Sequence, residues 1–84
     1  MPINIYDKDT IMIAKKHLDI INANLNHYVV AEHMFNNADT QESRSLWAQH
    51  GIDALDALAV YGIKPSAGHA IRREQWEQSI KIAA

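Results

Sequence analysis

Residues 7–37, DKDTIMIAKKHLDIINANLNHYVVAEHMFNN, form the longest periodic run in the chain and decide its fold. Apolar side chains recur in this run every three or four positions, at Ile11, Ala14, Leu18, Ile21, Leu25, Tyr28 and Phe35. This spacing puts side chains on one face of an α-helix, so it predicts a first helix over residues 7–37. Asp7 can cap its start, and Asn36 and Asn37 can end it. Because such a helix is roughly 40 Å long at 1.5 Å per residue, it needs partners along its whole length.

A second apolar strip lies roughly opposite the first on the same helix. Its members are Met12, Ile13, Ile20, Val30 and Met34. A helix that is apolar on two sides is typically held between helices of its own chain or against another copy of the chain. We therefore expect Ile13, Ile20 and Met34 to take part in self-association. Asn24 lies beside this strip, where it either sets the register of an oligomer, as a buried Asn does in coiled coils, or faces solvent.

Residues 41–62 predict a second amphipathic helix. Either Asp39 or Thr40 can cap its start, and Gly62 followed by Pro65 can end it. Its apolar face consists of Trp47, Ala48, Gly51, Ile52, Leu55, Leu58, Ala59 and Gly62. Gly51 is unfavourable by about 1 kcal/mol relative to Ala in the middle of a helix, which predicts that the neighbouring helix backbone approaches closely there.

The short turn between the two helices predicts a long antiparallel hairpin. Its register places Leu25 near Ile52 and Ile21 near Leu55. A third, shorter helix over residues 66–83 can be capped by Ser66. One narrow face of this helix can pack on the hairpin, whereas Ile71 and Ile82 lie roughly opposite. The predicted fold class is therefore all-α, a small helical bundle in which residues 1–6 form an extended arm.

The composition indicates a single small helical domain over residues 1–84. The chain has no cysteine, and its first residues, MPINIY, lack the basic and apolar regions of a secretion signal. No apolar run approaches the roughly 20 residues that span a bilayer, so we expect a cytoplasmic protein and no membrane partner. The formal net charge of −2 argues against strong binding to a nucleic-acid backbone.

The sequence predicts no catalytic or metal site. Among the five histidines, the nearest candidate pair of ligands is His50 with Asp53, one helical turn apart, and two ligands are too few. The serines lack the strand–turn–helix context of a nucleophile elbow, and the three glycines do not form a phosphate loop. We therefore expect no enzyme activity, no cofactor and no metal.

Five residues are candidates for contact with a partner. Glu32 falls on the main apolar face of the first helix, where it either pairs with Arg44 near the hairpin end or is held for a basic group of a partner. His69, Arg72, Arg73 and Trp76 form the only basic–aromatic cluster of the chain. Arg and Trp are enriched at binding hot spots, although a Trp such as Trp76 is more often an anchor of the core.

These features favour a small protein–protein interaction module that acts as an inhibitor, adaptor or regulator and associates with itself. A first alternative is a binder of a small anionic ligand, such as a nucleotide, held between helices of an oligomer. Its candidate contacts are Lys15, Lys16, Tyr61, Arg72 and Arg73. A second alternative is nucleic-acid binding through the third helix, which the net charge disfavours.

Overall fold

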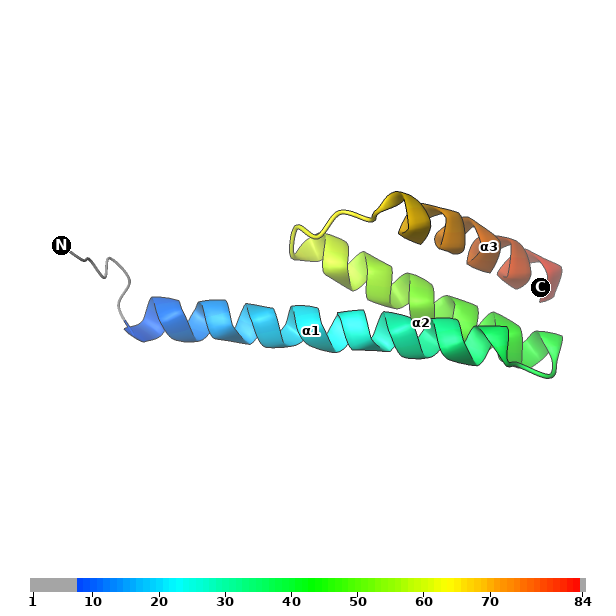
Figure 1. The fold of residues 1–84 in the computed structure, drawn as a ribbon, viewed down its shortest axis with the longest axis horizontal. Coiled ribbons are helices and arrows are strands. Elements are labelled where there is room, and N and C mark those ends of the chain that lie inside the picture. Colours follow the sequence, from blue (N-terminus) through cyan, green and yellow to red (C-terminus); the bar gives the residue numbers. More distant parts are fainter. Residues whose placement is uncertain (1–7, 84) are drawn as a thin grey trace.

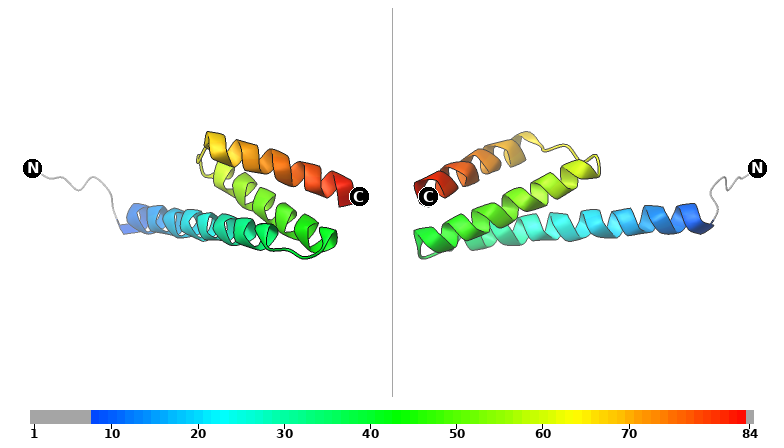
Figure 2. Two further views of the ribbon diagram at one scale, coloured as in Figure 1. Left: turned by 45° about the vertical axis from the view of Figure 1, so that its right-hand side comes forward. Right: turned by 180° about the vertical axis from the view of Figure 1, so that it is seen from behind.

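The computed structural model describes the backbone of residues 8–83 and the side chains of residues 15–83. Three helices follow one another: α1 (Lys8–Asn36), α2 (Gln41–Val60) and α3 (Ala67–Ala83). Helices α1 and α2 form an antiparallel hairpin, and α3 returns along α2 (Figures 1 and 2). The described residues contain no strand. The predicted all-α hairpin with a third shorter helix is confirmed, while the predicted arm at residues 1–6 lies outside the described residues.

Hydroxyl side chains cap the N-termini of α2 and α3. The Thr40 hydroxyl accepts a hydrogen bond from the Ser43 N–H at 3.0 Å, so Thr40 rather than Asp39 is the N-cap of α2. The Ser66 hydroxyl does the same for α3, accepting from the His69 N–H at 3.2 Å.

The end of α2 is a Schellman turn around Gly62. The Ile63 N–H donates to the Leu58 carbonyl and the Gly62 N–H donates to the Ala59 carbonyl, both at 3.0 Å. Gly62 has a φ of 84°, a left-handed conformation that a side chain disfavours. This turn lets the chain reverse and start α3.

Two aromatic contacts fix the register of the hairpin. The rings of His27 and His50 have centroids 5.5 Å apart, and those of His17 and Tyr61 are 5.3 Å apart. This register agrees with the predicted pairing of Leu25 with Ile52. Because α2 ends at the level of His17, residues 8–16 of α1 extend beyond it (Figure 1).

The core is centred on Trp76 of α3, whose side chain is fully buried. The other buried members are Tyr28, Ala48, Ile52, Ala54, Leu55 and Leu58. The indole lies directly over Gly51, so a Cβ atom at that position would collide with the ring. The close approach predicted at Gly51 is therefore real, but it involves this side chain of α3 rather than the backbone of a neighbouring helix.

The indole Nε1 of Trp76 has no hydrogen-bond partner among the described residues. Leaving a buried donor unpaired costs about 1–3 kcal/mol. The burial of the large indole ring has to exceed that cost, which makes Trp76 the principal apolar anchor of α3.

Part of the predicted apolar face of the hairpin is not in the core. Leu18 is 58% exposed and Leu25 is 36% exposed, and Ala59 and Gly62 are exposed as well. The reason is the position of α3, which reaches the hairpin only from the level of Tyr28 onward, where His69 meets it. None of the helices in the described part of the chain combines the length and the apolar character needed to cross a membrane.

Candidate functional site

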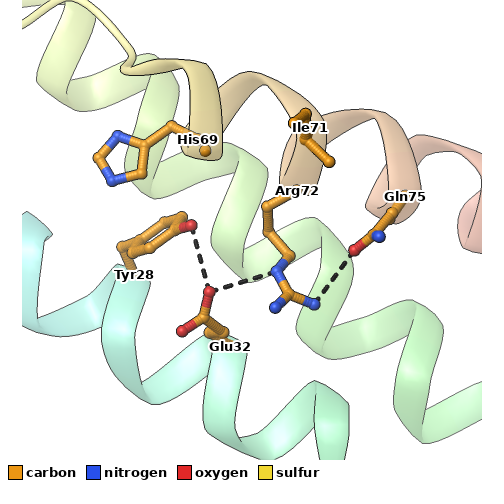
Figure 3. Close-up of a pocket in the computed structure, with 7 residues that line it drawn as sticks. Tyr28, Glu32, His69, Ile71, Arg72 and Gln75 are labelled. Carbon is orange, nitrogen blue, oxygen red and sulfur yellow. Dashed lines mark hydrogen bonds and ion pairs between the residues drawn. The ribbon is translucent and has the colours of Figure 1, made fainter.

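A cavity of about 420 Å³ lies between α1 and α3. Helix α1 contributes Tyr28 and Glu32 to its lining, and α3 contributes Gly68, His69, Ile71, Arg72 and Gln75 (Figure 3). We call it the α1–α3 groove. Its volume is within the range of small-ligand sites, and its lining mixes an aromatic ring with charged and polar groups.

An ion pair joins the two walls of the groove. The Nε of Arg72 is 3.2 Å from the Oε2 of Glu32, and the Tyr28 hydroxyl donates to the same oxygen at 3.4 Å (Figure 3). Arg72 also donates through Nη1 to the side-chain oxygens of Asn36 and Gln75, at 3.3 and 3.2 Å. The charges in the groove are therefore largely matched within the chain.

The expected pairing of Glu32 with Arg44 is wrong. Arg44 donates instead to the Gln41 side chain at 3.0 Å and to the Ala38 carbonyl at 3.3 Å, where it ties the hairpin turn to α2. Glu32 faces α3 rather than the first turn of α2, because α3 packs against that side of the hairpin. The sequence alone does not show on which side of the hairpin the third helix packs.

Tyr28 is the most buried side chain of the groove, at 7% exposure. Its burial, followed by the neighbouring negative charge of Glu32, raises the pKa of its phenol above the usual value of 10.0. The ring of His69 packs against it at an interplanar angle of 53°, with a centroid distance of 4.6 Å. The phenol therefore stays protonated at neutral pH and acts as a hydrogen-bond donor to Glu32.

The basic–aromatic cluster predicted on α3 is divided between three environments. Trp76 is in the core, and His69 and Arg72 face the α1–α3 groove. Arg73 lies on the α2 side, where its Nη1 is 2.7 Å from Asp56 and its Nε is 2.9 Å from Glu77. These two hydrogen bonds raise the pKa of the Arg73 guanidinium. The four residues therefore do not form one binding site.

The candidate contacts for an anionic ligand are also separated. Lys15 and Lys16 are exposed on α1, and Lys16 precedes Glu32, the partner of Arg72, by sixteen residues, which is about 24 Å along the helix. Tyr61 stacks on His17 at the far end of the hairpin. Among the basic side chains, only Arg72 and His69 line the groove.

A second surface lies on the side of the hairpin that faces away from α3, and we call it the hairpin face. At 100° per residue, its members from α1 are Lys16, Ile20, Ala23, His27, Val30 and Met34, and those from α2 are Leu46, His50, Asp53, Ala57 and Val60. Ile20 and Met34 are each 39% exposed, and Leu46 and Val60 are 56% and 80% exposed. In its centre the ring of His27 lies against that of His50, which in turn packs against the ring of Trp47 with a centroid distance of 5.2 Å.

Two of the residues predicted for self-association, Ile20 and Met34, thus lie together on the hairpin face. The side chain of Ile13 lies outside the described side chains. Asn24 is half-buried, and its amide donates to the Ile20 carbonyl at 2.9 Å, within its own helix. Its predicted role in setting the register of an oligomer stays a prediction. The contribution of α2 to this face, Leu46 in particular, could have been found from its spacing from the buried face of that helix.

The described residues contain no group of three or more His, Cys, Asp or Glu side chains placed to hold a metal ion. The side chains of the α1–α3 groove could bind a ligand through hydrogen bonds and an ion pair. Comparisons of the chain with family models, with curated proteins and with solved structures found no match.

Proposed function

We propose that this chain is a small protein-interaction module that acts in the cytoplasm as an inhibitor, adaptor or regulator of another protein and that also associates with itself. The observation that supports the proposal most directly is the exposure of large apolar side chains along both flanks of α1. Leu18, Ile20, Leu25, Val29, Val30 and Met34 are between 36% and 60% exposed. Contiguous apolar patches on a small protein are typical of surfaces that bind other proteins.

The two flanks of α1 face in different directions. Leu18, Leu25 and Val29 lie on the flank next to the start of α3, and we call them the outer row. Ile20 and Met34 belong to the hairpin face. A helix with two separate apolar flanks can bind two partners at once, which is why we assign the flanks to different partners.

Photo-crosslinking in cells tests the proposal. A photoreactive amino acid in place of Val29, which is 60% exposed, should give one defined adduct larger than two copies of the chain. The same amino acid in place of Glu74, an exposed polar position on α3, is the matched control. No adduct at position 29, or equal adducts at both positions, would count against a protein partner at the outer row.

A small anionic ligand remains a second candidate because the α1–α3 groove has a suitable volume and contains Arg72 and His69. An anion there would compete with Glu32 for the Arg72 guanidinium. The Glu32→Gln variant should therefore bind such a ligand more tightly than the wild type. A nucleotide library that leaves the melting temperature of both proteins unchanged would dismiss this candidate, since a ligand of the folded state must stabilise it.

A further inference from the structure

We propose that the hairpin face is covered by a second copy of this chain, related by a two-fold axis that crosses α1 near Ala23 and α2 near Asp53. The inference deepens the proposed function and rests on its self-association part, while the outer row is left for a different protein.

One seven-residue row of α1 on this face, residues 13, 20, 27 and 34, is centred between residues 23 and 24. Ile20 and His27 are equally far from that midpoint, and positions 13 and 34 are so as well. When two copies of α1 lie antiparallel across that midpoint, Ile20 therefore meets His27 of the other copy. Ala23 stands at the midpoint and is exposed, and its small side chain allows the two helices to approach.

The apolar positions of α2 are symmetric about a point at the same level. The exposed Leu46 and Val60 are equally far from Asp53. The contact of His27 with His50 places Asp53 opposite residue 24 of α1, and the contact of His17 with Tyr61 places it opposite residue 25. The two midpoints therefore agree to within two residues along the hairpin. One two-fold axis can serve both helices, as a self-complementary interface between identical chains requires.

The unequal lengths of the helices point to the same partner. Residues 8–16 of α1, which include Ile11, Met12 and Ile13 in the sequence, extend beyond the end of α2 (Figure 1). In the antiparallel pair these residues lie beside residues 31–39 of the other copy. The extension of each chain thus gains a neighbour, and the two hairpins form a four-helix arrangement.

The area of the face is adequate for a stable dimer. Helices α1 and α2 run side by side over the length of α2, 20 residues or about 30 Å, and two helices are about 20 Å wide. The accessible area of such a side-chain surface exceeds its projection of about 600 Å², so it approaches the roughly 800 Å² per partner of a standard interface. Only Lys16 and Asp53 among the members of the face carry a formal charge at neutral pH.

The position of Asp53 distinguishes binding of a second copy from binding of any other partner. On the two-fold axis the carboxylate of Asp53 faces its own counterpart, and two like charges oppose association. The Asp53→Asn variant should therefore dimerise several-fold more tightly than the wild type at low salt. Asp56→Asn makes the same change of charge one turn away, on the side that faces Arg73 of α3, and should leave the dissociation constant unchanged.

Cysteine crosslinking locates the axis. Because the chain contains no cysteine, a single introduced thiol can form a disulfide only with its own counterpart. Ala23→Cys should be converted to a linked dimer under mild oxidation. Val29→Cys, which is on the opposite flank of α1, should stay unlinked at the same protein concentration. Equal crosslinking of the two variants would overturn the proposed axis, and so would faster crosslinking at position 29.

The solution mass by light scattering decides whether the dimer exists. We expect twice the chain mass for the wild type at micromolar concentration and a single-chain mass for Ile20→Asp, with a helical circular dichroism spectrum in both. A wild type that stays monomeric up to millimolar concentration overturns the inference. That result would also remove the self-association part of the proposed function, but it would leave crosslinking to another protein from position 29 unaffected. The failure of this inference is therefore distinguishable from a failure of the proposed binding to another protein. If Ile20→Asp does not fold, the pair of aspartate variants and the pair of cysteine variants still decide the question.

Discussion

Gly51 occupies the point where Trp76 of α3 rests on α2. A Cβ atom there would overlap the fully buried indole, so the ring or the backbone of one helix has to shift. Gly51→Ala should therefore lower the free energy of unfolding by about 1–3 kcal/mol, even though alanine favours a helix by about 1 kcal/mol. Urea denaturation measures the change. Gly68→Ala is the control, because its Cβ would meet only the Ser66 hydroxyl at 3.8 Å, and it should be neutral or slightly stabilising.

The phenol of Tyr28 makes the fold sensitive to alkali. Its pKa is raised in the folded state by burial and by Glu32, so the folded protein holds this proton more tightly than the unfolded chain does. The resulting stabilisation is complete below pH 10, the unfolded pKa, and is lost as the pH rises through the folded pKa. The phenolate absorbance of the folded wild type should have a late component that Tyr28→Phe removes. A late component that remains in Tyr28→Phe, or that persists in the urea-unfolded wild type, would contradict this.

Helix α3 depends on Trp76 for its attachment to the hairpin. The indole fills the space over Gly51 and contacts the rings of Tyr28 and Phe35, with centroid distances of 5.3 and 6.3 Å. Trp76→Ala should cost about 3–5 kcal/mol. The detached 17-residue α3 should also lose much of its helical signal, because most of the stability of a helix in a protein comes from tertiary packing. Circular dichroism and urea denaturation measure both effects, with the 72% exposed Ile82→Ala as the control. Full helicity with a loss below 1 kcal/mol would show that α3 has other anchors.

The ion pair between Glu32 and Arg72 joins α3 to α1 from the other side. The two side chains are 36% and 24% exposed, so a double-mutant cycle with Glu32→Gln and Arg72→Gln should give a coupling of about 0.5–1 kcal/mol. The exposed pair of Arg73 with Glu77 within α3 is the reference and should give about 0.3–0.5 kcal/mol. A coupling of zero for Glu32 and Arg72 would mean that this contact does not help to hold α3.

The elements were predictable from the sequence because local residues determine where a helix begins and ends. Thr40, Ser66 and Gly62 stand at the observed caps, and each helix boundary differs from its expected position by at most two residues. How the helices pack on one another was less predictable. The sequence does not tell on which side of the hairpin α3 packs, so it did not reveal Arg72 as the partner of Glu32.

The long first helix was recognised as apolar on two sides because this property depends on spacing alone. Which of its residues are covered depends on where α3 begins, and this follows from the length of the turn after Gly62. For that reason Leu18 and Leu25, which belong to the predicted apolar face, are exposed. The hairpin face could not be predicted without the register between α1 and α2, because its symmetry appears only when Asp53 is placed opposite Asn24.

In the whole molecule, α1 is packed against α2 along only part of its length. This predicts which of its backbone hydrogen bonds open most easily. Residues 8–16 lie beyond the end of α2, so in a single chain their helical hydrogen bonds depend on local helix propensity, which is weak for a short segment. In the antiparallel pair the same residues lie against the end of α1 in the other copy. Their amide hydrogens should therefore exchange much more slowly in the wild type at high concentration than in Ile20→Asp. Amides in the core of α2, such as that of Leu55, should be protected in both proteins and serve as the internal reference. Equal exchange of residues 8–16 in the two proteins would mean that the extension of α1 is not covered by a second copy.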